Sequence, residues 1–190
     1  KSLRKAVPRD VAAAWQPPMA RANPTDLIFS QDQVRVADLV PLRHERMSIS
    51  PFAFYRGAAL VMAHDLSALP TTGIEVQMCG DAHLANFGFY LSPERRCVFD
   101  INDFDETARG PWEWDVARLV TSLEICGRDR GFSRKTCSKV ALASASGYRE
   151  AMRRFAEMGN LDVWYAHMAI DELMSTLGEK MDKASRKNDD

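Results

Sequence analysis

The sequence predicts an α+β domain that is mostly helical and carries one short β-hairpin. Three patterns predict this class. Apolar residues recur at helical spacing in four stretches, apolar and polar residues alternate in a short run before Cys79, and the pentads "FGFYL" and "CVFDI" flank the turn-forming "SPERR". The chain has 190 residues, 46% of them hydrophobic, which is enough for one ordinary core.

Residues 1–49 show little periodicity and contain the proline-bearing runs "QPPM", "ANPTD" and "LVPLR". We expect an extended N-terminal arm with one short helix around Gln31–Leu39. Its charged side chains are expected to be solvated, with phosphate binding as the alternative: Arg35, Arg43, His44 and Arg46. The start has no apolar stretch typical of a signal peptide and no initiator Met, so we expect a fragment of a longer protein.

Residues 50–185 are predicted to form one domain that begins with a helix. Ser50 is a good N-cap and Pro51 suits the first helical position. Apolar residues then follow at helical spacing as far as "LPTTG": Phe52, Tyr55, Ala59, Met62 and Leu66.

A strand, a hairpin and three more helices are expected after this helix. The alternation of Ile74, Val76 and Met78 with polar residues predicts the strand, and "ARGP" is predicted to be a break after the hairpin. The second helix is marked by Trp112, Val116, Leu119, Val120 and Leu123, and Ser133 is expected to cap the third. "MGN" precedes a fourth helix with Leu161, Trp164, Met168 and Leu177, and residues 186–190 are expected to be a frayed tail.

Composition limits the classes of function. No run approaches 18 consecutive apolar residues, so we expect no membrane span. Four cysteines without CxxC spacing favour reduced thiols in a cytoplasmic protein. Residues 61–120 carry 4 Lys+Arg against 10 Asp+Glu, which argues against a nucleic-acid-binding surface over the domain and favours a divalent cation site.

Two motifs in this acidic segment fit phosphoryl transfer. "CGDAHLANFGFY" contains Asp81 and Asn86 in the spacing D-x-x-x-x-N, and "FDINDFDET" places Asp103 and Phe104 after the predicted hairpin. Ionised carboxylates are costly to bury without a cation, and kinase-type sites use an Asp base with Asp and Asn oxygens around magnesium. One Asp and one Asn suffice, because magnesium keeps waters and phosphate oxygens among its ligands.

Four segments in order resemble a known bacterial family: "SPFAFYRGAALVMAHDL", "VQMCGDAHLANFG", "VFDINDFDET" and "GPWEWDVARL". They resemble domain of unknown function 2252, clearly over residues 30–135. That family is similar to the protein-kinase-like superfamily, whose aminoglycoside and choline phosphotransferases carry "H-G-D-x-x-x-x-N", then "I-D-F/W" and "D-P-x-x-D-L-A". The resemblance implies the C-terminal, catalytic lobe of the kinase-like fold.

The same resemblance implies roles for individual residues. Asp81 would be the catalytic base, Asn86 and Asp103 would be Mg²⁺ ligands, and Asp115 would brace the catalytic loop by hydrogen bonds. The cofactors implied are Mg²⁺ and ATP. His83 is expected to stabilise the loop by a hydrogen bond, with metal ligation as the alternative.

Two supporting side chains are left with open roles. Asp105 replaces the glycine of the D-F-G turn and, with Glu106, either supports the ligands or is a solvated acid. Arg56 is expected to pair with an acid, bind phosphate or be exposed.

Other features depart from the kinase pattern. Cys79 stands where small-molecule kinases have His, and no Gly-rich loop with a strand Lys precedes Asp81. Lys is absent from positions 6–134. The resemblance therefore implies that the nucleotide clamp lies beyond Asp190.

The expected function is an ATP- and Mg-dependent phosphotransferase acting on a small-molecule acceptor. One alternative is a metal-dependent phosphohydrolase, favoured by "GDAH" with clustered Asp, although the further D-x-H, "GNH" and "GHxH" pieces do not occur. The other alternative is a non-catalytic kinase-like binding module. The expected partners are a nucleotide and the acceptor, with neither nucleic acid nor a membrane, while the oligomeric state and the acceptor are left open.

Overall fold

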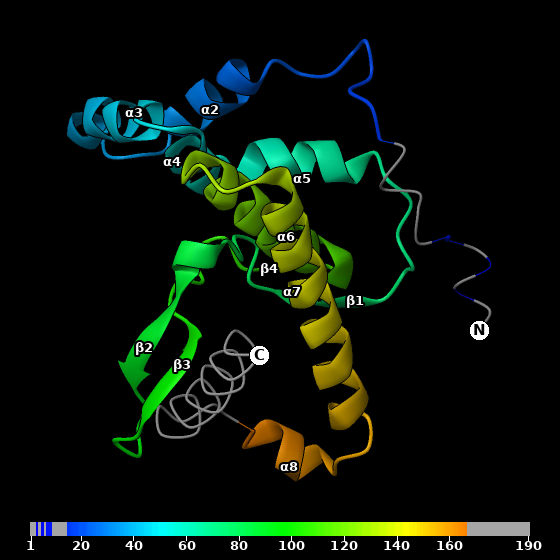
Figure 1. Ribbon diagram of the computed structural model, residues 1–190. Helices are drawn as coiled ribbons and strands as arrows, with labels where there is room; N and C mark the ends of the chain where they lie inside the picture. Colours follow the sequence, from blue (N-terminus) through cyan, green and yellow to red (C-terminus); the bar gives the residue numbers. More distant parts are fainter. Residues whose placement is uncertain (1–2, 4, 6, 9–14, 167–190) are drawn as a thin grey trace, which may run out of the picture.

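The computed structural model describes residues 3, 5, 7–8 and 15–166 and confirms a mostly helical α+β architecture. The helices are α2 (Pro24–Asp32), α3 (Val40–Ser48), α4 (Pro51–Arg56), α5 (Ala59–Ser67), α6 (Trp112–Asp129), α7 (Arg134–Phe155) and α8 (Asn160–Trp164). The strands are β1 (Glu75–Met78), β2 (Phe87–Leu91), β3 (Cys97–Ile101) and β4 (Ala108–Pro111), and two 3₁₀ turns are η2 (Ala37–Leu39) and η3 (Leu84–Asn86). In Figure 1, α7 runs beside α6 and continues past it to α8, while the β2–β3 hairpin stands away from these helices.

Residues 24–48 are largely helical, so the prediction of an extended arm was wrong for this part, whereas residues 15–23 are irregular. The side chain of Asn23 caps α2 by accepting from the backbone N–H of Thr25, and Pro24 occupies the first turn. The predicted helix around Gln31–Leu39 was also wrong, because α2 ends at Asp32 and a turn separates it from η2. Helices of nine residues are too short for a clear amphipathic period, although the Asn-Pro start of α2 was visible.

The helix predicted after Ser50 is interrupted. The side chain of Ser50 caps α4 as expected, but the chain breaks at Gly57 and Ala58 before α5 begins. A Cβ on Gly57 would overlap the side chain of Met47, so this position allows a close approach of α3. The helical spacing of apolar residues continues across this break, so the sequence pattern did not reveal it.

Buried apolar residues from both sides of position 50 form one hydrophobic cluster: Ile28, Met47, Ala58 and Val61. Leu27 packs against the cluster from α2. The helices that precede Ser50 therefore belong to the same core as α4 and α5.

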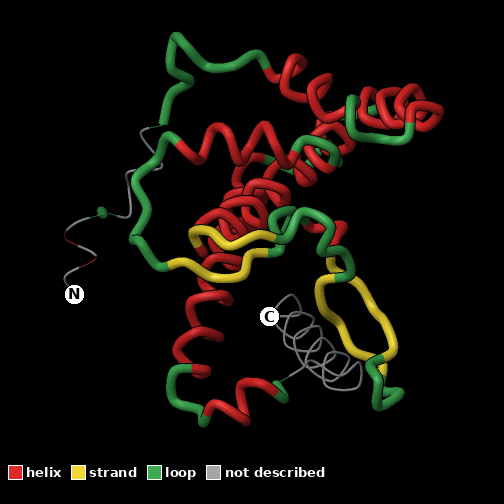
Figure 2. Tube along the Cα trace, turned by 180° about the vertical axis from the view of Figure 1, so that it is seen from behind, coloured by secondary structure: helices red, strands yellow, loops and turns green. Residues whose placement is uncertain are grey.

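The strands form two separate antiparallel pairs (Figure 2). The predicted hairpin is confirmed, with β2 and β3 in register from Phe87 opposite Ile101 to Leu91 opposite Cys97. The predicted break "ARGP" is in fact β4, which pairs with β1 from Glu75 opposite Pro111 to Met78 opposite Ala108. Ala, Gly and Pro have low strand propensity, so only pairing with β1 makes this segment a strand.

Helices α6 and α7 confirm the predictions for the second and third helices. Ser133 caps α7 by accepting from the N–H of Thr136, and the rings of Trp112 and Tyr148 stack 5.7 Å apart where the two helices meet. The predicted fourth helix begins as α8, whereas its later positions Met168 and Leu177 and the tail 186–190 lie outside the described residues.

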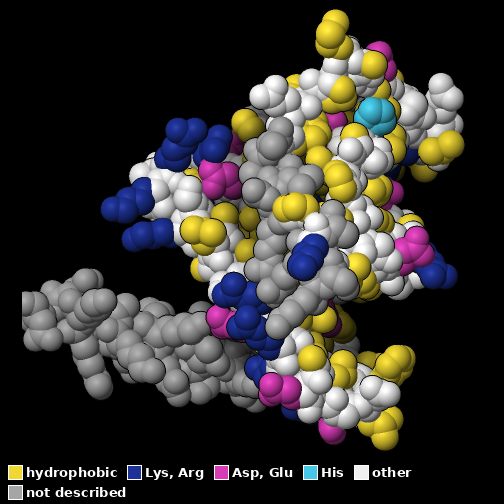
Figure 3. Space-filling model, turned by 90° about the vertical axis from the view of Figure 1, so that its right-hand side faces the viewer, with side chains coloured by type: hydrophobic (Ala, Val, Ile, Leu, Met, Phe, Trp, Pro, Cys, Tyr) yellow, Lys and Arg dark blue, Asp and Glu magenta, His cyan; other side chains and the backbone are white. Residues whose placement is uncertain are grey.

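Three further features bear on what the composition predicted: the state of the cysteines, the apolar length of the helices and the distribution of charge on the surface. All four cysteines are free, as expected. Among the described helices, none is both long and apolar enough to cross a membrane. Figure 3 shows one face, on which the described Lys and Arg side chains form several separate groups among apolar and acidic ones.

Candidate functional site

Asp81 lies on a sharp turn that follows β1. We refer to residues 79–83 as the Asp81 loop. Gly80 has a φ of +83°, and a Cβ at this position would overlap the backbone carbonyl of Glu106. Only glycine meets both conditions, so the local sequence Cys-Gly-Asp brings the Asp81 loop directly against the acidic loop, residues 102–107, which joins β3 to β4.

Asp115, in the first turn of α6, holds the Asp81 loop through its backbone. Its Oδ2 accepts from the N–H of Cys79 at 2.8 Å and its Oδ1 accepts from the N–H of Gly80 at 3.0 Å. Hydrogen bonds to an ionised carboxylate are stronger than neutral ones. These are the hydrogen bonds that the family resemblance implied for Asp115.

Asn86 ties the two loops together. Its Nδ2 donates to the carbonyl of Asp81 at 3.1 Å and to the carbonyl of Asp103 at 3.0 Å, and the residue is only 6% exposed. The thiol of Cys79 also lies 3.5 Å from the carbonyl of Asp103. Asp115, Asn86 and Cys79 thus all support the Asp81 loop.

A buried arginine, which the sequence did not single out, holds the side chain of Asp81. Arg118 on α6 is 3% exposed, and its Nε lies 2.6 Å from Oδ1 of Asp81. Its Nη2 donates to the carbonyl of Tyr55 at 2.8 Å, and the guanidinium lies 4.3 Å from the centroid of the Tyr55 ring. Burial raises the pKa of Tyr55 to about 12, so the phenol stays protonated and donates to the carbonyl of Arg118.

A sequence signal for Arg118 does exist. It lies three residues after Asp115 and between Val116 and Leu119, which are apolar and partly buried on α6. A charged residue within such an apolar series must find a partner when it is buried. That partner is Asp81, which comes from another element and is not visible in the local pattern.

His83 lies beside Asp81 and is also buried. Its Nε2 is 3.8 Å from Oδ2 of Asp81, and its Nδ1 has no hydrogen-bond partner among the described residues. Burial lowers the pKa of His83, an effect that the Asp81 carboxylate opposes and that Arg118 and Arg56 reinforce. The imidazole is therefore neutral at neutral pH, which suits packing beneath the loop.

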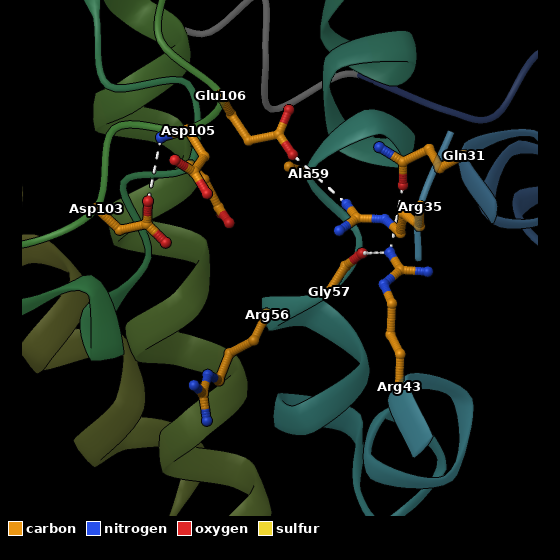
Figure 4. Close-up of a pocket in the computed structure, with 10 residues that line it drawn as sticks. Gln31, Arg35, Arg43, Arg56, Gly57, Ala59, Asp103, Asp105 and Glu106 are labelled. Carbon is orange, nitrogen blue, oxygen red and sulfur yellow. Dashed lines mark hydrogen bonds and ion pairs between the residues drawn. The ribbon is translucent and has the colours of Figure 1, made fainter. Parts of the chain in front are cut away.

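The two loops face a small polar pocket of about 190 Å³. Its acidic lining consists of Asp81, Asp103, Asp105 and Glu106, and its basic lining consists of Arg35, Arg43 and Arg56. Figure 4 shows Asp103, Asp105 and Glu106 on one side of the pocket and Arg35 and Arg43 on the other. Of the residues predicted for a site, the pocket unites Asp81, Asp103, Asp105 and Arg56.

Asn86 and Asp115 support the loops by hydrogen bonds without lining the pocket in the described part of the chain. His83 does not line it either, and the loop-stabilising hydrogen bond predicted for its side chain is not formed among the described residues. The arginines expected to be solvated differ in position. Arg35 and Arg43 line the pocket, whereas Arg46 is exposed on α3.

In the described part of the chain, no three His, Cys, Asp or Glu residues lie close enough together to hold a metal ion. Asp103 offers a carboxylate at the pocket, where its Oδ1 accepts from the N–H of Asp105 at 3.1 Å. Asn86 is buried and does not line this pocket, and its Nδ2 donates to two backbone carbonyls.

The fold and the site define a class of protein: a mostly helical α+β domain in which two acid-bearing loops are locked together at a polar pocket. The chain belongs to the family described as an uncharacterized protein conserved in bacteria, DUF2252, whose model matches residues 35–188. No curated protein and no solved structure gives a significant match to the chain.

Proposed function

We propose that the protein is a kinase-like, ATP- and Mg-dependent phosphotransferase that acts on a small-molecule acceptor. One observation carries the proposal: Asp81 and Asp103 come from two different loops, line the same pocket and are joined through the side chain of Asn86. A base carboxylate and a metal-binding carboxylate facing one space are what phosphoryl transfer requires.

Asp81 is the proposed general base. Its Oδ1 is held by Arg118, which fixes the orientation of the carboxylate and leaves Oδ2 to accept a proton. The proton comes from the hydroxyl of the acceptor, whose oxygen forms the new bond to phosphorus as the bond to the leaving phosphate oxygen breaks. Side-chain exposure of 20% leaves Asp81 accessible from the pocket.

Asp103 is the residue that fits magnesium best. It is exposed at the pocket, and carboxylate oxygens are the hard ligands that Mg²⁺ prefers. When bound there, Mg²⁺ would offset the negative charge of the phosphates. Asn86 is only 6% exposed and does not line the pocket, so it fits this role less well and acts in the proposal as the tie between the loops.

The pocket fits the phosphate end of a nucleotide. Sites for whole drug-sized ligands enclose about 300–1,000 Å³, and the observed volume of about 190 Å³ is below that range. The base and ribose would therefore lie outside this pocket.

The experiment follows the γ-phosphate of labelled ATP in the presence of Mg²⁺ and a mixture of small hydroxyl compounds. We expect label on an acceptor with wild-type protein, at least 100-fold slower transfer with Asp81→Asn, and nucleotide affinity that changes little. Asp103→Asn should remove the Mg²⁺-dependent rise in melting temperature seen with nucleotide.

Other outcomes favour the alternatives. Label released only as inorganic phosphate would favour the phosphohydrolase. Nucleotide binding without any turnover, by wild-type and Asp81→Asn protein alike, would favour the non-catalytic module. Unchanged turnover in Asp81→Asn would reject Asp81 as the base.

A further inference from the structure

Three arginines from separate segments converge on the pocket. Arg35 lies in the turn between α2 and η2, Arg43 on α3, and Arg56 at the end of α4. We call them the arginine cluster. In Figure 4, Arg35 and Arg43 lie close together across the pocket from Asp103, whereas the side chain of Arg56 extends away from these two arginines.

The acids of the pocket neutralise this cluster only weakly. Within the described residues, one ion pair crosses between the two sides, from Nη2 of Arg35 to Oε1 of Glu106 at 3.7 Å. Both side chains of that pair are about two-fifths exposed, at 40% and 43%. Such an exposed, long pair contributes little to stability.

The side chain of Arg56 has neither a hydrogen bond nor an ion pair with any residue in the described part of the chain. Its charge nevertheless acts on the site, since it helps to lower the pKa of His83. An unpaired guanidinium beside Asp81 and His83 is available to a ligand.

Arg43 is held rigidly. Its Nη2 donates to the carbonyl of Gly57 at 2.7 Å and to Oε1 of Gln31 at 3.3 Å, while Nη1 lies 3.4 Å from Oδ1 of Asp32. The Gly57 carbonyl lies at the break between α4 and α5, where the helical pattern of hydrogen bonds is interrupted. The interruption of the helix thus fixes one arginine of the cluster.

Arg35 and Arg43 also repel each other. Burial lowers the pKa of Arg43 and the nearby charge of Arg35 lowers it further, while the carboxylates of Asp32 and Glu106 oppose this change. Placing two guanidinium groups together is unfavourable in an empty pocket and becomes favourable when an anion lies between them.

We propose that Arg35, Arg43 and Arg56 form a phosphate-binding subsite that takes the phosphate groups of a phosphorylated ligand. Guanidinium groups match phosphate oxygens through paired hydrogen bonds. The pocket volume of about 190 Å³ equals that of about six waters at ~30 Å³ each, which is room for one or two phosphate groups with a cation.

This inference deepens the proposed function: the phosphate contacts come from N-terminal helices, where a Gly-rich loop and Lys would serve in kinases. Phosphate binding does not require turnover, so an experiment can reject the subsite without rejecting the phosphotransferase function, and the reverse.

The test uses inorganic pyrophosphate as the probe, titrated into the 190-residue chain with Mg²⁺ and followed by calorimetry. We expect saturable binding that Arg56→Gln and Arg35→Gln each weaken about tenfold, because each removes one charge-assisted contact. Arg46→Gln is the matched control, since Arg46 is exposed on α3 and does not line the pocket, and it should bind as the wild type does.

Equal affinities for all four proteins, or no saturable binding by the wild type, would overturn the subsite. Phosphoryl transfer that persists in such a case would leave Asp81 and Asp103 in their proposed roles. If pyrophosphate still binds and Asp81→Asn keeps full turnover, the subsite is supported and Asp81 is rejected as the general base.

Discussion

Arg118 determines how the Asp81 carboxylate is oriented, so its removal should be felt in stability as well as in activity. Breaking a buried ion pair by removing one partner costs roughly 3–5 kcal/mol. Asp81 keeps 20% of its side-chain exposure, so we expect Arg118→Met to lower the free energy of unfolding by about 3 kcal/mol. Urea unfolding measures this loss.

Arg128 on the same helix provides the control. It is 60% exposed and pairs with Glu124 one turn earlier, so Arg128→Met should cost less than about 0.5 kcal/mol. Comparable losses for the two arginines would mean that the Asp81 pair does not stabilise the fold.

His83 makes a pH-dependent contribution with a defined sign. Burial lowers its pKa, so the unfolded chain takes up the proton first as the pH falls below the ordinary value of about 6.5. The free energy of unfolding should therefore decrease from about pH 7.5 to about pH 5.5. In His83→Gln this decrease should be smaller, as measured by urea midpoints.

His64→Gln, at an exposed position on α5, is the matched control and should keep the wild-type pH dependence. A slope that is the same in His83→Gln and in the wild type would show that other groups cause it.

At the scale of elements, the contact between the Asp81 loop and the acidic loop depends on Gly80. Gly80→Ala would place a methyl group on a positive-φ residue and against the carbonyl of Glu106, so we expect a loss of at least ~2 kcal/mol. Gly147 is in α7 with open space around it, so Gly147→Ala should stabilise by about 0.5–1 kcal/mol. Thermal unfolding of both variants would show the contrast, and a stabilised Gly80→Ala would contradict the close approach.

The sequence alone predicted those elements that are marked by a local pattern of residues. The hairpin, α6 and α7 were predicted because turn residues, caps and long apolar periods are local signals. β4 was missed because its residues become a strand only through pairing with β1, and the break at Gly57 was missed because it depends on the distant Met47. Spacing singled out Asp81, Asn86 and Asp103 as candidates, whereas recognising Arg118 required knowledge of what packs against α6.

At the scale of the whole molecule, the N-terminal helices share the core with the segments that form the site. Ile28 on α2 is 4% exposed and packs with Met47, Ala58 and Val61. Arg21 also forms a two-point ion pair with Asp65 of α5, with both distances at 2.6 Å. These contacts hold the segments that carry Arg35 and Arg43 against the pocket.

We expect Ile28→Ala to lower the free energy of unfolding by roughly 2–4 kcal/mol, because the substitution leaves a cavity in this cluster. Val34→Ala is the control, since Val34 is 88% exposed, and it should change stability by less than about 0.5 kcal/mol. Denaturant midpoints measure both, and a neutral Ile28→Ala would indicate that the N-terminal helices are not part of the cooperative core.

The sequence raised phosphate binding by Arg35, Arg43 and Arg56 only as an alternative, because it does not show which acids these arginines face. Arg35 and Arg43 lie far before the site motifs in the sequence. They reach the pocket only because α2 packs against α5 and α3 packs against α4. Local sequence shows that a residue is charged, but only tertiary packing decides which charge it faces.

The tie between the two loops also closes the base of the hairpin. The N–H of Asn102 donates to the carbonyl of Asn86 at 2.9 Å, next to the bond from the Asn86 amide to Asp103. Residues 92–96 at the far end are separated from this closure by the full length of β2 and β3. A fluorophore or an affinity tag introduced at that tip would report on the molecule while leaving its chemistry undisturbed.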